Sequence, residues 1–241
     1  QAASPAVARL WVHHDTVVLG IQDSRLPQAA AGIDYLQTQG YHVIVRNSGG
    51  LAVPLDEGVL NISLVLPVDN VFSNIDLGYE TMFTLVKEML RPYTTRVVAR
   101  EIEGSYCPGR YDLSISGRKF AGISQRRTKG GMAVQVFLIV DGTGRERAQL
   151  IKRFYAIAAP SGSAKLPVPA VRGETVASLT ELLSVDLSIE MLKHRLLNVL
   201  QTYADRIVTT ALTSHEKSLF ASNRERMIAR NRKSLGLLAA Q

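Results

Sequence analysis

Four short stretches in the first third of the chain have the composition of β-strands, and in the longest of them hydrophobic and polar residues alternate with the period of two of a half-buried strand. The stretches are rich in β-branched, leucine and aromatic residues, most of which favour a pleated surface. We expect strands over residues 10–14, 16–20, 41–45 and 56–67.

Other segments have apolar residues at helical spacing, three or four positions apart. The first of these ends at Gly40, a helix stop, and the second begins at Ser73 or Asn74, either of which can act as the N-cap. The predicted helices cover residues 24–39, 74–93 and 145–158.

The centre of the chain returns to strands. Two short alternating runs, Asp112–Ile115 and a second beginning at Arg118, are joined by a turn that contains Gly117, which is typical of a β-hairpin. The strongly apolar run at 132–140 predicts a central strand. The pattern so far is that of one domain in which strands and helices are mixed.

Residues 160–173 are rich in Pro, Ser and Gly and are expected to form a linker or covering loop. After them the pattern of apolar residues changes. Beyond this segment the pattern is helical, at 179–183, 188–208 and 213–237. We therefore expect a main domain over residues 1–173 and a C-terminal helical extension, 174–241, packed on it.

Composition narrows the class of protein. A chain of 241 residues with 46% apolar and 20% charged residues can bury one good-sized core. No run approaches the roughly 18 apolar residues of a membrane helix, and no targeting signal is recognisable after Gln1. A single cysteine excludes an internal disulfide, which favours a reducing, cytoplasmic location.

A formal net charge of +7 predicts attraction to an acidic partner. Aromatic residues make up only 6% of the chain and no known nucleic-acid-binding spacing occurs, so an acidic protein surface fits better than nucleic acid. The basic residues of segment 213–237 are either a solvated helix face or part of such a docking surface.

The single cysteine, Cys107, lies in a Tyr-Cys-Pro-Gly loop, a composition of surface turns. A lone cysteine is most often a small buried apolar residue. However, the predicted hairpin folds Lys119 back towards this loop, and a cationic neighbour favours the nucleophilic thiolate. The segment from Leu113 to Val140 contains no acidic residue, which leaves its positive charge uncompensated. Cys107 is therefore a candidate nucleophile.

A second candidate site follows the strand at 41–45, where Arg46-Asn-Ser-Gly-Gly begins. Two glycines after a strand let backbone N–H groups approach a ligand closely, and Arg46 adds a fixed positive charge. A plain turn is the alternative. The five histidines show no metal-ligand spacing, and His13 and His14 are expected to be structural or solvent-facing, so no metal site is predicted.

Two segments together resemble the signatures of the biotin/lipoate protein ligase superfamily. Arg46 to Val53, followed by Asp56 and Asn61, resembles its Arg-x-x-Gly-Gly-x-Ala-Val signature. Asp112 to Ser124 resembles its second signature, in which a lysine follows a glycine turn and precedes Ala-Gly. The resemblance covers about residues 10–159. It implies an α+β fold with a mixed, largely antiparallel sheet flanked by helices, the class II synthetase-like catalytic domain.

The run from Gly104 to Asp112 is most similar to the amidotransferase branch of that superfamily. This resemblance implies an acyltransferase of protein lipoylation that moves an octanoyl group from a lysine of the glycine cleavage H protein to lysines of E2 lipoyl domains. It implies that Cys107 carries the acyl group as a thioester and that Lys119 promotes ionisation of the thiol. The acyl chain is expected in an apolar tunnel beside the glycine turn. Six residues are expected to bind substrate: Arg46, Ser48, Gly49, Gly50, Gly122 and Ile123. The last two are the candidates for the oxyanion hole.

The sequence departs from the ATP-dependent lipoate ligases at three positions of the glycine signature, where Asn47, Leu51 and Leu55 replace an Arg, a Gly and a His. We therefore expect no ATP and no other cofactor. The alternatives are an ATP-dependent lipoate or octanoate ligase, a transferase that takes octanoate from acyl carrier protein, and a non-catalytic acyl-carrier-binding protein. Neither nucleic acid nor a membrane is expected as a partner.

Overall fold

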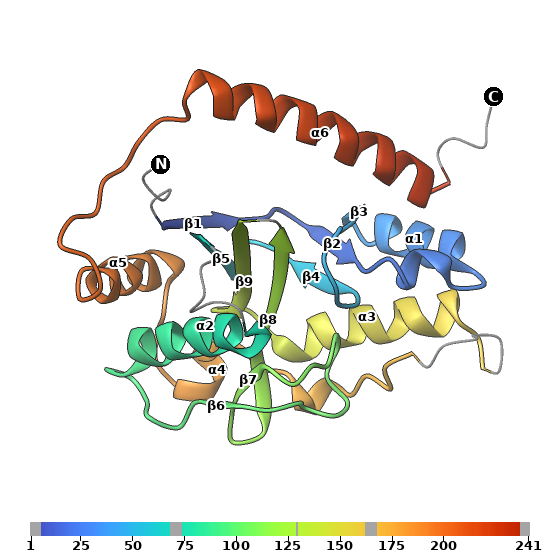
Figure 1. Cartoon of the computed structure of the whole chain (residues 1–241). Helices are drawn as coiled ribbons and strands as arrows, with labels where there is room; N and C mark the ends of the chain where they lie inside the picture. Colours follow the sequence, from blue (N-terminus) through green and yellow to red (C-terminus); the bar gives the residue numbers. More distant parts are fainter. Residues whose placement is uncertain (1–5, 68–73, 129, 162–167, 237–241) are drawn as a thin grey trace.

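The computed structural model describes residues 6–67, 74–128, 130–161 and 168–236 and contains two β-sheets packed between helices (Figure 1). The larger sheet has six antiparallel strands in the order β1-β5-β9-β8-β7-β6. These strands are β1 (Val7–Val12), β5 (Val59–Pro67), β6 (Val98–Ala99), β7 (Asp112–Ile115), β8 (Arg118–Thr128) and β9 (Gly131–Ile139).

The smaller sheet has the order β3-β2-β4, with β2 parallel to β3 and antiparallel to β4. Its strands are β2 (Thr16–Leu19), β3 (His42–Val45) and β4 (Val53–Leu55). The predicted strand at 56–67 begins later than expected, because Gly58 donates its N–H to the Asp56 side chain in a turn at 2.9 Å. The α+β class, with a mixed and largely antiparallel arrangement, is confirmed.

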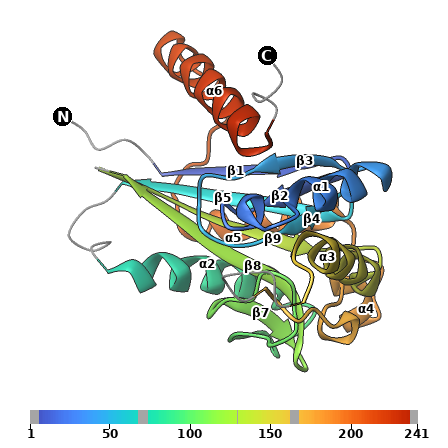
Figure 2. The ribbon, with the colours of Figure 1, turned by 90° about the vertical axis from the view of Figure 1, so that its right-hand side faces the viewer.

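Helices cover both sides of this arrangement (Figure 2). α2 (Ile75–Leu90) packs on the larger sheet, and α1 (Ala29–Thr38) and α3 (Gly144–Ala158) pack together near the smaller one. The side chain of Asn74 accepts a hydrogen bond from the N–H of Asp76, which confirms Asn74 as the N-cap of α2. Ser73, the other cap considered, lies outside the described residues.

The two faces of the larger sheet serve different purposes. Leu60, Ile62 and Leu64 belong to the hydrophobic cluster that includes α2. The residues between them, Asn61 and Ser63, point to the opposite face, since successive side chains of a strand alternate. Strand β9 lies between β5 and β8, as its apolar sequence predicted.

The chain after the covering loop divides into two parts. α4 (Leu179–Leu183) and α5 (Ile189–Leu200) contribute Leu179, Leu192 and Leu196 to the cluster around α2. α6 (Ser214–Ser234) instead crosses the top of the molecule in Figure 1, and almost all of its residues are exposed. The domain boundary expected after residue 173 stays a prediction. None of the helices in the described ranges is long and apolar enough to cross a membrane.

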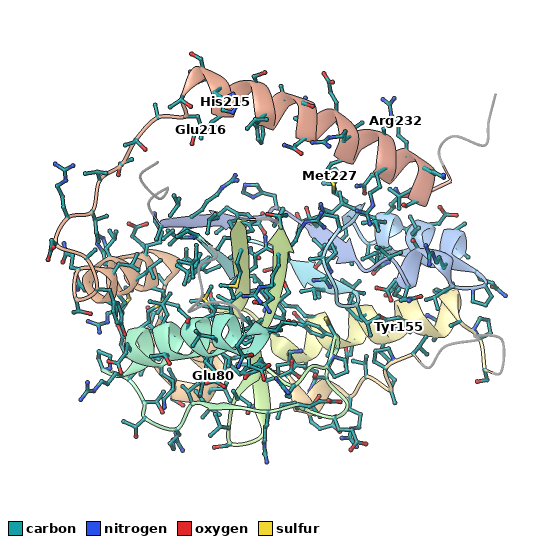
Figure 3. All side chains as sticks on the ribbon, in the orientation of Figure 1. Glu80, Tyr155, His215, Glu216, Met227 and Arg232 are labelled. Atoms are coloured by element: carbon teal, nitrogen blue, oxygen red, sulfur yellow. The ribbon has the colours of Figure 1, made fainter. Side chains whose placement is uncertain are left out.

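α6 is fastened to the rest of the molecule near its C-terminal end. The Asn231 side chain accepts a hydrogen bond from the Val45 N–H (2.6 Å) and donates one to the Val45 carbonyl (3.1 Å). Asn47 contacts the sulfur of Met227 at 3.6 Å. Figure 3 shows Met227 on the side of α6 that faces the domain and Arg232 on the far side. The end of α6 therefore lies against the strand that leads into the glycine turn.

A buried ion pair ties the β4–β5 turn to α3. Arg147 donates from Nε and Nη2 to the two carboxylate oxygens of Asp56, at 2.7 and 2.6 Å. The side chains are 7% and 15% exposed, so removing one partner leaves a desolvated charge uncompensated.

We expect Asp56→Ala to lower the free energy of unfolding by about 3–5 kcal/mol, measured by urea denaturation. The control is Arg91→Ala, which removes the solvent-exposed ion pair with Glu88 and should cost less than about 1 kcal/mol. Equal effects of the two substitutions would show that the Asp56–Arg147 pair contributes no more than a surface pair.

Candidate active site

Cys107 lies in the loop between β6 and β7, and its backbone adopts φ 45°, in the left-handed region that residues other than glycine rarely occupy. Such a conformation costs about 1–3 kcal/mol and persists only where neighbouring contacts impose it. The Cys107 side chain is partly exposed, and its thiol is free.

The neighbouring contact that holds this loop comes from Lys119. The hairpin between β7 and β8 turns at Ser116 and Gly117, with φ of 51° and 78°, and it brings Lys119 beneath the loop as predicted. The Lys119 ammonium donates to the carbonyl of Tyr106 (2.9 Å) and to the carbonyl of Cys107 itself (2.7 Å).

The third partner of the ammonium is the carboxylate of Asp112, at 2.8 Å from Nζ. Both side chains are buried, at 0% and 3% exposure. Burial raises the pKa of Asp112, and the nearby Lys119 charge opposes that rise. Asp112 also accepts from the Ile102 N–H at 3.2 Å, so the carboxylate joins the Lys119 ammonium to the start of the loop.

The far end of the loop is fastened to α2. The Tyr111 ring stacks on Tyr79, with centroids 4.7 Å apart, and its hydroxyl donates to Glu80 at 2.7 Å. Arg110 forms an ion pair with Asp76 in the first turn of the same helix. Figure 3 labels Glu80 on α2. The loop that carries Cys107 is thus held at both ends and from below.

The glycine turn approaches the sulfur from the other side. Leu51 donates its N–H to the Cys107 Sγ at 3.1 Å. The Arg46 guanidinium bonds the Leu51 carbonyl, and its Nη2 lies 3.7 Å from Sγ. A Cβ on Gly50 would lie 3.2 Å from Sγ and 3.1 Å from Arg46 Nη2, and Gly50 has φ 110°, so only glycine fits easily here.

A cavity of about 330 Å³ extends from Cys107 between the two sheets. One row of paired residues, Trp11, Asn61, Phe137 and Gly122, crosses the larger sheet along it. The smaller sheet contributes aliphatic side chains to the opposite wall, namely Val18, Ile44, Val53 and Leu55. A Cβ on Gly122 would lie 2.8 Å from the Phe137 ring, so glycine makes room for that ring.

All six residues predicted to bind substrate line this cavity together with Cys107. They are Arg46, Ser48, Gly49, Gly50, Gly122 and Ile123. Lys119 is not among the lining residues and reaches Cys107 through its carbonyl. The effect of Lys119 on the sulfur, and the oxyanion role of Gly122 and Ile123, stay predictions.

Sequence reasoning missed several lining residues. His14 is exposed and paired with Glu57, as expected of a solvent-facing residue, but His13 lines the cavity and accepts a hydrogen bond from Trp11 Nε1 at 3.0 Å. Burial lowers the pKa of His13, which favours the neutral imidazole that this bond requires. Trp11 and His13 are two positions apart, so they share one strand face, and this spacing could have predicted that His13 lies beside Trp11. No cluster of potential metal ligands occurs within the described residues.

The chain belongs to the family described as "Lipoyl protein ligase A/B catalytic domain", which it matches over residues 1–201. The resemblance inferred from the two signatures is therefore confirmed. In this chain the loop cysteine and the glycine turn line one cavity, and the buried lysine holds the cysteine loop through its backbone carbonyls.

Two relatives match almost the whole chain. An octanoyl-[GcvH]:protein N-octanoyltransferase of Bacillus velezensis is 54% identical, over 97% of this chain and 82% of the relative. A lipoyl-[GcvH]:protein N-lipoyltransferase of Listeria monocytogenes is 51% identical, over 96% and 84%.

Solved structures share the fold at lower identity. Lipoate-protein ligase A bound with ATP matches with a TM-score of 0.73 and 23% identity, over 99% of this chain and 89% of that one. A bipartite lipoate protein ligase of Thermoplasma acidophilum matches with a TM-score of 0.69 and 22% identity, over 99% and 87%. The biotin/lipoate ligase fold is confirmed.

The position of Arg46 predicts an effect on thiol reactivity. We expect Arg46→Gln to slow alkylation of Cys107 by iodoacetamide at neutral pH by about tenfold, because it removes the guanidinium that lies 3.7 Å from Sγ and bonds the Leu51 carbonyl. The rate is measured by mass spectrometry of the intact protein. Arg91→Gln is the control, since Arg91 pairs with Glu88 at the exposed end of α2 and not with a residue of the glycine turn. Equal rates in the two variants would remove Arg46 from this role.

Proposed function

We propose that this protein transfers an octanoyl group from a lysine of the glycine cleavage H protein to lysines of E2 lipoyl domains, with the acyl group held on Cys107 as a thioester. The observation that carries this proposal is the placement of the one free thiol in the lining of a cavity with an aliphatic wall, with a backbone N–H and a guanidinium beside its sulfur. This arrangement suits a nucleophile that accepts an aliphatic acyl chain.

Relatives at about half identity support the choice of reaction. The B. velezensis protein is named for octanoyl transfer from GcvH to protein, and the L. monocytogenes protein for lipoyl transfer from the same donor. Both names describe an acyl group that moves from one carrier protein to another. We assign octanoyl as the acyl group of this chain.

In the first half-reaction the Cys107 thiolate attacks the carbonyl carbon of the octanoyl-lysine amide. The C–S bond forms first and gives a tetrahedral intermediate; the C–N bond then breaks, and the lysine amine of the donor leaves with the proton that the thiol has lost. Backbone N–H groups beside the carbonyl oxygen stabilise the tetrahedral intermediate, an effect typically worth roughly 10²–10³ in rate. We assign that role to Gly122 and Ile123.

Lys119 has two roles in this proposal. Its bond to the Cys107 carbonyl holds the loop in the left-handed conformation that directs the sulfur at the glycine turn. We also assign to its ammonium the promotion of thiol ionisation that the family resemblance implies, with Asp112 offsetting part of its charge. The pairing of its ammonium with Asp112 and two carbonyls gives the first role direct geometric support.

The second half-reaction is the reverse of the first. A lysine amine of an E2 lipoyl domain attacks the thioester carbonyl, the C–S bond breaks, and the thiol is regenerated. Donor and acceptor use the same opening in turn, so the kinetics are ping-pong.

The acyl group arrives already bound to a carrier, so the reaction needs no ATP to activate it. The glycine turn fits this view, because its Leu51 N–H is directed at the sulfur. We place the reaction in the cytoplasm, where a free catalytic thiol stays reduced.

Mass spectrometry of the intact protein mixed with octanoylated H protein, without ATP, tests the proposal. We expect the mass to rise by one octanoyl group on Cys107, and we expect an apo lipoyl domain added afterwards to remove it. Cys107→Ala should form no adduct and transfer nothing, while its circular dichroism spectrum and thermal midpoint stay close to those of the parent.

Transfer by Cys107→Ala would rule out the covalent route. Transfer that requires ATP and free octanoate would instead identify a ligase. Octanoyl-acyl carrier protein, offered in a parallel reaction, separates a second donor from the H protein. Carrier binding without an adduct would identify a binding protein.

A further inference from the structure

A buried aspartate and a buried tyrosine lie next to the glycine turn and contact its backbone. Asp23 follows β2 in a short 3₁₀ turn and is 1% exposed. Tyr155 lies on α3, where Figure 3 labels it, and is 3% exposed. Neither side chain lines the cavity at Cys107, so neither is placed to touch the acyl chain.

The two side chains form one hydrogen-bonded chain that ends on the backbone of the turn. Tyr155 donates its hydroxyl to Asp23 Oδ1 at 2.8 Å. The same hydroxyl oxygen accepts the N–H of Ala52 at 3.3 Å. Asp23 Oδ2 accepts the N–H of Gly20 at 2.8 Å. Ala52 directly follows Leu51, whose N–H points at the sulfur of Cys107.

Gly20 gives the same turn a second support. A Cβ on Gly20 would lie 1.9 Å from the carbonyl oxygen of Gly50, so the two backbones are in direct contact. Asp23 holds the backbone of Gly20, which packs against Gly50. Tyr155 holds the backbone of Ala52, the residue after Leu51. Both ends of the Gly50–Leu51 unit rest on the Asp23–Tyr155 pair.

The turn needs such support because its own residues supply little. Gly49 and Gly50 have no side chains to restrict the backbone, and glycine has the largest conformational freedom of any residue. Arg46 bonds the Leu51 carbonyl on the side of the sulfur. Asp23 and Tyr155 supply further support through Gly20 and Ala52.

Burial of the pair has an electrostatic cost. Desolvation raises the pKa of Asp23, and the bonds from Gly20 and Tyr155 and the charge of Arg46 oppose that rise. Burial also raises the pKa of Tyr155, so the phenol keeps its proton and can donate it to Asp23. A cluster that served packing alone would not require an aspartate at this position.

We propose that Asp23 and Tyr155 are positioning residues, which hold the glycine turn so that the Leu51 N–H stays on the Cys107 sulfur and stabilises it for acyl transfer. The inference rests on the proposed function for its kinetic consequence. Its consequence for the thiol itself does not depend on which acyl donor the protein uses.

The test compares Tyr155→Phe with Tyr35→Phe. Tyr155→Phe removes the hydroxyl that joins Asp23 to Ala52 and keeps the ring. Tyr35 packs against the same hydrophobic cluster, and its side chain makes no hydrogen bond within the described residues. Tyr35→Phe therefore controls for the loss of a tyrosine hydroxyl near that core.

Single-turnover formation of octanoyl-Cys107 from octanoylated H protein is measured at a temperature where both variants are folded by circular dichroism. We expect Tyr155→Phe to lower the maximal rate by about 10- to 100-fold, as small displacements of reacting groups do. The half-saturating carrier concentration should change by less than about twofold, because carrier contacts are intact. Tyr35→Phe should match the parent protein.

Alkylation of Cys107 by iodoacetamide at neutral pH gives a readout without any carrier. We expect it to slow several-fold in Tyr155→Phe and to be unchanged in Tyr35→Phe. A parent protein that accepts no octanoyl group would defeat the proposed function, but the alkylation rates would still decide the positioning role.

Asp23→Asn is the second variant and carries the test if Tyr155→Phe does not fold. The introduced amide keeps one oxygen that can accept a hydrogen bond, but its NH₂ group faces either the Gly20 N–H or the Tyr155 hydroxyl. We therefore expect a smaller loss of rate than in Tyr155→Phe. A lower thermal midpoint with unchanged maximal rate and unchanged alkylation in the folded variants would show that the pair is only structural, and would overturn the inference.

Discussion

The fully buried ammonium of Lys119 is the constraint on which the site depends. A charge withdrawn from water must be compensated, and here two carbonyls and the Asp112 carboxylate compensate it. Both carbonyls belong to the loop that carries Cys107, so satisfying the ammonium also fixes the loop. The left-handed backbone of Cys107 persists because these bonds outweigh its strain.

The two sheets explain why an apolar cavity lies beside that loop. The face of the larger sheet that bears Leu60 and Ile62 is filled by α2 and its neighbours. Its other face is opposed by the smaller sheet, and near Cys107 the two sheets enclose a cavity that Gly122 and Phe137 help to line. Glycine at this point gives room to the Phe137 ring, while aliphatic residues of the smaller sheet keep the opposite wall apolar.

Much of this could be predicted because it depends on local sequence. Gly117 and the alternating runs around it predicted the hairpin that carries Lys119, and the two glycines after Arg46 predicted a turn whose backbone is open to close approach, which in the structure comes to lie beside the Cys107 sulfur. Each feature is encoded within about ten consecutive residues, where turn chemistry and the period of two decide the outcome.

The remaining features depend on contacts between distant parts of the chain. The place of Trp11 and Asn61 in the cavity is set by the register of β1 against β5, which no local pattern specifies. The sequence placed Lys119 near the Cys107 loop, but it did not reveal that the ammonium bonds two backbone carbonyls and Asp112, or that Arg46 lies beside the sulfur. The role of His13 depended on which strand face meets the smaller sheet.

The contact of Asn231 with Val45 has a consequence for solubility. β3 is an edge strand, and the N–H and carbonyl of an edge residue are a template onto which a strand of another molecule can pair. The Asn231 amide forms hydrogen bonds with both the N–H and the carbonyl of Val45. One side chain of α6 therefore makes the two bonds that a neighbouring strand would otherwise make. α6 thereby blocks intermolecular β-addition at the position from which the chain enters the glycine turn.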